Sequence, residues 1–72
     1  MRNWDSEWAV LSATERAAFR EKSDATAALT RVFARYGAPD MELIARAETA
    51  ESRWAAARAA CDRFIAEFRK VA

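Results

Sequence analysis

The chain has few side chains that could carry out chemistry. It contains one cysteine, Cys61, and no histidine, although histidine is the usual general base near neutral pH and the commonest metal ligand. Without a histidine, the Cys61 thiol has no ordinary base to activate it. Carboxylate pairs such as Glu48 and Glu51 suggest a metal on a helical bundle, but the ferritin-like pattern needs a Glu-x-x-His motif. A glycine-rich phosphate loop is also missing. We therefore predict a non-enzymatic protein with no catalytic residues, no metal site and no cofactor.

Arginines are the next group that could recognise a ligand. Arg16, Arg20, Arg31 and Arg35 should lie near one side of a helix, and a local basic patch is enough to contact a nucleic-acid backbone. Arg20 and Asp24 are four residues apart, which is the spacing of an ion pair on a helix. The predicted second helix offers three pairs with the same spacing: Glu42 and Arg46, Arg58 and Asp62, and Arg63 and Glu67. The net charge of only +1 also argues against binding of nucleic acid through bulk charge. We favour a solvated, salt-bridged surface and keep a nucleic-acid-binding face as the alternative.

Composition limits how this chain can be stable. Its 72 residues form one domain at most, and 19 of its apolar residues are alanines, which bury little area. A core this small usually needs a disulfide, a metal or a partner chain, and one cysteine excludes an internal disulfide. Self-association or a protein partner is the remaining stabiliser. Apolar runs are too short to span a membrane, and a signal-peptide core is missing, so we expect a cytoplasmic protein. The excess of arginine and alanine is typical of bacterial or phage genes.

The elements that position these residues are helices. A heptad pattern of apolar residues runs through the C-terminal half and predicts one helix over 39–71, beginning at Pro39. Its two rows are Leu43, Ala50, Ala57, Phe64 and Val71, and Ala47, Trp54, Cys61 and Phe68. The facing rows of a helix over 13–36 are Leu11, Ala18, Ala25 and Val32, and Glu15, Lys22, Leu29 and Tyr36.

Turn and capping signals set the expected topology. Gly37 should end the first helix, and the short connection makes the two helices antiparallel. This pairing places Lys22 opposite Trp54 and Leu11 opposite Ile65. The sequence from Ser12 to Glu15 reads as a capping box, so we expect a separate short helix or arm over 3–11. That arm should fold back over the end of the second helix, which would otherwise extend beyond the first.

Two features of this hairpin have competing interpretations. Trp4 and Trp8 either cover the end of the core or form a binding hot spot, and we favour the core. Cys61 is expected as a buried, inert thiol, with a disulfide between two chains as the alternative.

Surplus apolar residues point to a further interface. Phe19 and Phe33 lie on a row beside the core rows, and Ile44 and Ile65 flank the second helix in the same way. Helix propensity alone explains the small residues around the middle of that helix, and the alternative is that they allow another helix to approach closely. The predicted partner or dimer interface comprises Phe19, Phe33, Ile44, Trp54, Ala55, Ala59 and Ile65.

The predicted fold class is therefore all-α: an antiparallel hairpin with a short N-terminal helix or arm, dimerising into a four-helix bundle. We expect a protein–protein interaction module that acts as a small regulator, inhibitor or accessory subunit. The alternatives are a different protein partner in place of a second copy, a nucleic-acid-binding dimeric regulator, and an obligate small subunit of a larger enzyme.

Overall fold

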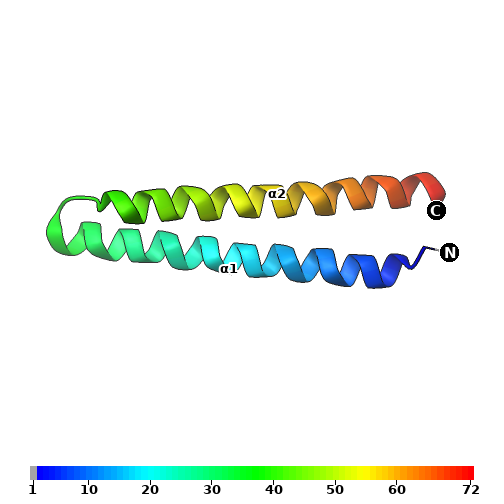
Figure 1. Ribbon diagram of the computed structural model, residues 1–72, viewed down its shortest axis with the longest axis horizontal. Coiled ribbons are helices and arrows are strands. Elements are labelled where there is room, and N and C mark those ends of the chain that lie inside the picture. Colours follow the sequence, from blue (N-terminus) through cyan, green and yellow to red (C-terminus); the bar gives the residue numbers. More distant parts are fainter. Residues whose placement is uncertain (1) are drawn as a thin grey trace.

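The computed structural model describes residues 2–72 as an antiparallel pair of long helices (Figure 1). Helix α1 spans Trp4–Tyr36 and helix α2 spans Met41–Val71, and a four-residue connection joins them. The hairpin forms a rod of 55 × 16 × 14 Å, with both termini at the end opposite the bend. The predicted all-α hairpin is confirmed for this part of the chain. Among residues 2–72, neither helix is long and apolar enough to cross a membrane.

Local side-chain contacts explain where the helices begin and end. The Asn3 side chain accepts a hydrogen bond from the Ser6 N–H, and the Asp40 carboxylate accepts bonds from the N–H groups of Glu42 and Leu43. Gly37 ends α1 with a left-handed φ of 70°, as predicted. Pro39 does not begin α2: the Asp40 cap holds residue 40 in an extended conformation, so the helix begins two residues later than expected.

Helix α1 continues without a break through Ser12, so the predicted division into 3–11 and 13–36 is wrong. The Ser12 hydroxyl donates to the carbonyl of Ala9, and the Thr14 hydroxyl donates to that of Val10. Both hydroxyls thus find acceptors on the preceding turn, and neither serves as a cap. The N-terminal residues reach the far end of α2 by extending α1 and do not fold back. The two helices consequently have nearly equal lengths, 33 and 31 residues.

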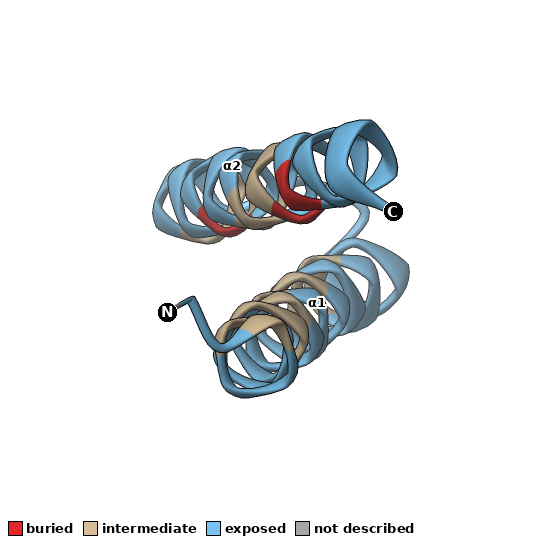
Figure 2. Cartoon of the chain, turned by 90° about the vertical axis from the view of Figure 1, so that its right-hand side faces the viewer, coloured by how far each residue is buried: buried red, intermediate tan, exposed pale blue. Residues whose placement is uncertain are grey.

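The core lies between the helices and is thin. Within residues 2–72 the buried side chains are Ala25, Ala50, Cys61 and Phe64. Figure 2 shows the buried and half-buried residues on the surfaces where α1 and α2 face each other. These positions follow the predicted heptad rows over most of their length. The ends depart from the prediction, because Tyr36, Phe68 and Val71 are exposed where the rod stops.

Candidate interaction surface

The heptad repeat gives the hairpin two different sides. Phe19 and Phe33 are two heptads apart, and Ile44 and Ile65 are three heptads apart, so each pair follows one flank of its helix. Corresponding flanks of antiparallel helices meet on the same side of the pair. This placement agrees with two shallow grooves, one shared by Phe19 and Arg58 and the other by Trp8 and Ile65. We call this surface the apolar side and define it by Trp8, Phe19, Phe33, Ile44 and Ile65.

Most of the apolar side is open to solvent. Phe33 is 54% exposed, Phe19 49%, Trp8 39% and Ile65 37%, while Ile44 is half-buried. These residues extend from the bend to the open end of the rod. Two helices can bury only the stripes that face each other, so the adjacent stripe is left without a partner in a single copy.

At the open end, aromatic residues from both helices pack together. The Trp4 ring lies 5.3 Å from that of Phe64 and 5.4 Å from that of Phe68, and both contacts are edge-to-face. Trp8 lies 5.6 Å from Phe64 and lines the groove beside Ile65. Trp4 therefore covers the end of the core as predicted, whereas Trp8 also contributes exposed apolar surface.

Arg2 joins the two ends of the chain. Its Nε donates to Glu7 at 2.6 Å, its Nη1 donates to Glu67 at 2.7 Å, and its guanidinium lies 3.9 Å from the centre of the Trp4 ring. The hydrogen bonds to Glu7 and Glu67 raise the pKa of Arg2 above its ordinary value. The sequence pattern did not indicate this contact, because Arg2 and Glu67 are 65 residues apart.

At mid-length, a tryptophan is surrounded by polar and aromatic groups. The Trp54 Nε1 donates to Glu15 at 2.9 Å, and the Lys22 ammonium lies 4.3 Å from the Trp54 ring centre. Phe19 meets the same ring edge-to-face at 5.9 Å. The predicted pairing of Lys22 with Trp54 is confirmed, and the indole connects the core to the apolar side through Phe19.

The opposite side of the hairpin is polar, and we call it the charged side. It forms a shallow hollow whose lining includes Glu21, Asp24, Arg46, Thr49 and Arg53. Arg53 and Glu21 approach to 3.9 Å across the two helices, and both are well exposed. Such a pair adds little stability, but it marks which residues of α1 and α2 lie level with one another.

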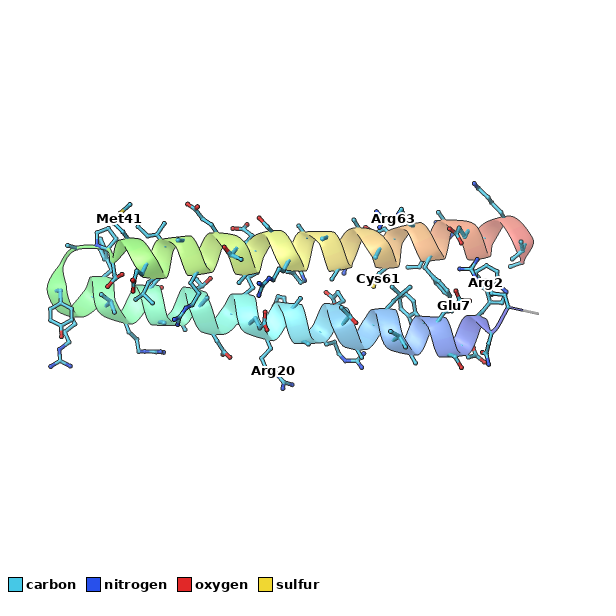
Figure 3. All side chains as sticks on the ribbon, in the orientation of Figure 1. Arg2, Glu7, Arg20, Met41, Cys61 and Arg63 are labelled. Atoms are coloured by element: carbon cyan, nitrogen blue, oxygen red, sulfur yellow. The ribbon has the colours of Figure 1, made fainter. Side chains whose placement is uncertain are left out.

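The candidate nucleic-acid residues do not follow the predicted ion-pair pattern. On α2, Arg58 and Asp62 pair at 3.9 Å as expected, whereas the expected pairs Glu42–Arg46 and Arg63–Glu67 do not form within residues 2–72. Within residues 2–72, however, Arg16, Arg20, Arg31 and Arg35 form no ion pair, so the expected Arg20–Asp24 bridge is wrong. Arg20 points away from α2 into solvent (Figure 3).

Cys61 lies between the helices (Figure 3). It is 5% exposed, and its thiol lies 3.6 Å from the carbonyl oxygen of Leu11. The prediction of a buried thiol is confirmed, and this inward position is unfavourable for a disulfide to a second chain. Leu11 was predicted to lie opposite Ile65. It contacts Cys61 instead, which lies one helical turn before Ile65 on α2.

The alanines proposed for close helix approach differ in exposure, since Ala55 is exposed and Ala59 half-buried. Their role in an interface stays a prediction. Within residues 2–72, no three cysteine or acidic side chains gather closely enough to hold a metal ion. No protein-family model, no curated protein and no solved structure matches this chain.

Proposed function

We propose that the chain is a non-enzymatic helical interaction module that binds protein through its apolar side. In this role it acts as a small regulator, inhibitor or accessory subunit. A helical surface is the feature it offers to a partner, since the grooves on it are shallow and its exposed aromatic residues are spread along the rod.

The observation that carries this proposal is the set of apolar side chains left uncovered on one side of the rod. Phe33 is 54% exposed, Phe19 49%, Trp8 39% and Ile65 37%. The hairpin exposes 5625 Å² in all, about 1,100 Å² more than the usual scaling with mass gives for a folded monomer of 8.1 kDa, because it is a rod of 55 × 16 × 14 Å. Apolar side chains gathered on one exposed side mark interaction sites.

Photo-crosslinking inside cells tests this assignment directly. Benzoylphenylalanine in place of Phe33 puts the reactive group on the apolar side, where the exposed position leaves room for the added benzoyl group. The same group in place of Thr49, on the charged side, is the matched control. We expect the Phe33 position to give a discrete protein adduct and the Thr49 position to give much less.

Adduct mass identifies the class of partner. An adduct of twice the chain mass indicates a second copy, and a larger discrete adduct indicates a different protein, including the large chain of an enzyme. Equal yields from both positions, or no protein adduct from Phe33 at expression levels that give folded protein, would contradict the proposal.

One observation favours a second candidate function, nucleic-acid binding. Arg16, Arg20, Arg31 and Arg35 have no ionic partner within residues 2–72, which leaves their guanidinium groups available to phosphate. The near-neutral net charge of +1 argues against it. Retention on heparin or RNA at low salt separates the two proposals. Loss of retention in an Arg16→Gln/Arg20→Gln variant would support the nucleic-acid role, and absence of retention at low salt would exclude it.

A further inference from the structure

We propose that the partner on the apolar side is a second copy of this chain, related by a two-fold axis that crosses the rod at its middle. The two hairpins would then lie with their bends at opposite ends, forming a four-helix bundle. This inference rests on the proposed function, because it names the partner for the same surface.

The flanking row of α2 is self-complementary when it is reversed. In chain order it reads Ile44, Glu51, Arg58 and Ile65, each one heptad after the last. A two-fold axis between Trp54 and Ala55 exchanges position 44 with position 65, and position 51 with position 58. Ile44 of each copy therefore meets Ile65 of the other, and Glu51 of each copy meets Arg58 of the other. A C2 interface requires this kind of self-matching surface.

Helix α1 has exposed aromatic residues on either side of a similar centre. Trp8 and Phe33 are equally distant from a point between Arg20 and Glu21, so reversal about that point brings the tryptophan of one copy level with the phenylalanine of the other. The two residues lie on neighbouring rows, because Trp8 is one heptad before Glu15 on the core row and Phe33 is on the flanking row. The pairing of Glu21 with Arg53 and the contact of Cys61 with Leu11 place this point within one helical turn of the level of the centre of α2. One axis perpendicular to the rod therefore passes close to the centres of both helices.

Charge distinguishes this arrangement from the other two-fold arrangement. If the bends of both hairpins lay at the same end, α1 of each copy would face α2 of the other at the same level. Arg58 would then lie over the region of Phe19, with which it shares a groove. Arg58 of one copy would then face a groove of the other that is lined by Glu15 as well as by Arg16 and Arg20, and Glu51 would not meet Arg58. The arrangement with opposed bends pairs Glu51 with Arg58 twice, and this complementarity favours it over the other orientation.

The row of α2 next to the flanking row opposes this dimer, because it carries acidic residues. Glu48 and Asp62 lie on it, and the same axis brings Glu48 of one copy close to Asp62 of the other. Asp62 already pairs with Arg58 of its own chain at 3.9 Å, so that arginine would stand between two carboxylates. The apolar contacts and the exchange of Glu51 with Arg58 outweigh this acidic pair in our proposal.

The size of the apolar side fits a stable dimer. One long face of the rod, 55 × 16 Å, is comparable to the roughly 800 Å² that each partner contributes to a standard-sized protein interface. The residues covered would be Phe19, Phe33 and Trp8, which are about half exposed in the single hairpin. A dimer of this size would also provide the core that the single copy lacks.

Charge reversal tests both the partner and the orientation. Glu51 and Arg58 are exposed in the hairpin, so their substitution leaves the core of each copy intact. We expect the wild-type chain to sediment as a dimer at micromolar concentration. Glu51→Arg alone and Arg58→Glu alone should each weaken the dimer about tenfold or more, because each places like charges together twice. An equimolar mixture of the two variants should form a heterodimer, detected by native mass spectrometry.

The control is Arg46→Glu on the charged side, which should dimerise as the wild type does. Circular dichroism establishes that each variant is folded. Single variants that dimerise like the wild type, or a mixture with no preference for the heterodimer, would overturn the orientation. A folded wild-type monomer would overturn the second copy as partner. In that case, a crosslink from position 33 to a different protein would still support the proposed function. If that crosslink also failed, the proposed function and the dimer would both be contradicted.

Discussion

The indole Nε1 of Trp54 donates a 2.9 Å hydrogen bond to Oε1 of Glu15 across the hairpin. This bond explains why a carboxylate occupies a core row that is otherwise mostly apolar. Lys22, one heptad later on the same row, places its ammonium 4.3 Å from the Trp54 ring centre. Two alanine-rich helices could pair in more than one register, and a polar contact at a core position is a known way to select one.

We predict that Glu15→Ala lowers the free energy of unfolding by about 1 kcal/mol, because it leaves a partly buried indole N–H without its acceptor. Glu15→Gln retains a side-chain oxygen acceptor and should cost less than half of that. Glu48→Ala on α2 is the control, since it has the same change in helix propensity and Glu48 is exposed. Urea denaturation followed by circular dichroism measures the difference. Equal midpoints for Glu15→Ala and Glu48→Ala would contradict the role assigned to this hydrogen bond.

The Cys61 thiol should be protected in the folded protein. It is 5% exposed and lies against the backbone of Leu11, so a thiol reagent reaches it only when the helices separate. We expect its reaction with Ellman's reagent to be at least about tenfold slower in buffer than in denaturing urea. Ala55→Cys in a Cys61→Ala background, with the thiol on an exposed position, is the fast control. Similar rates for the two thiols would show that the helix interface opens freely.

Substitution of Gly37 should destabilise the hairpin through the backbone alone. Its φ of 70° is unfavourable for residues with a Cβ, yet a Cβ added there would meet no atom within 4 Å. We predict a loss of about 1 kcal/mol for Gly37→Ala and a smaller loss for Gly37→Asn, which tolerates this conformation better. Thermal or urea unfolding measures both. An unchanged midpoint for Gly37→Ala would mean that the bend adopts another conformation in solution.

Removal of the Arg2 side chain should loosen the open end and leave the middle unchanged. Arg2→Gln loses the charged hydrogen bonds to Glu7 and Glu67, so amide hydrogens in the first turn of α1 and the last turns of α2 should exchange faster. Because these contacts raise the pKa of Arg2, its charge and its contribution persist up to alkaline pH. Arg63→Gln, which removes an outward-pointing arginine (Figure 3), is the control. Faster exchange at mid-length would contradict a local role for Arg2.

Much of the fold could be predicted because two simple signals dominate the sequence. Gly37 lies between two heptad patterns, and that arrangement specifies an antiparallel hairpin whose core rows are largely those observed. The pairing of Lys22 with Trp54 followed from the same geometry. The break at Ser12 was predicted wrongly, because serine and threonine hydroxyls can bond to the preceding turn as readily as they can cap a helix.

The contacts of long side chains could not be predicted from helical periodicity. Arg2 reaches Glu67, and Glu15 reaches Trp54, across distances that depend on how the helices are offset and on which rotamers the side chains adopt. Periodicity did place Phe19, Phe33, Ile44 and Ile65 outside the core rows. The exposure of Phe19, Phe33 and Ile65 agrees with that placement, and Ile44 is half-buried. The occupant of the apolar side is a property of an assembly, so one sequence alone leaves it as a prediction.

The shared location of the two termini has a practical consequence for protein engineering. Within one copy both ends lie at the same end of a rod 16 Å wide, so a peptide that spans this width could join them and new ends could be opened at the bend, giving a circular permutant. In the proposed bundle, the ends of one copy lie a full rod length from those of the other. A single-chain version of the bundle would need a linker spanning about 55 Å, or roughly 16 extended residues.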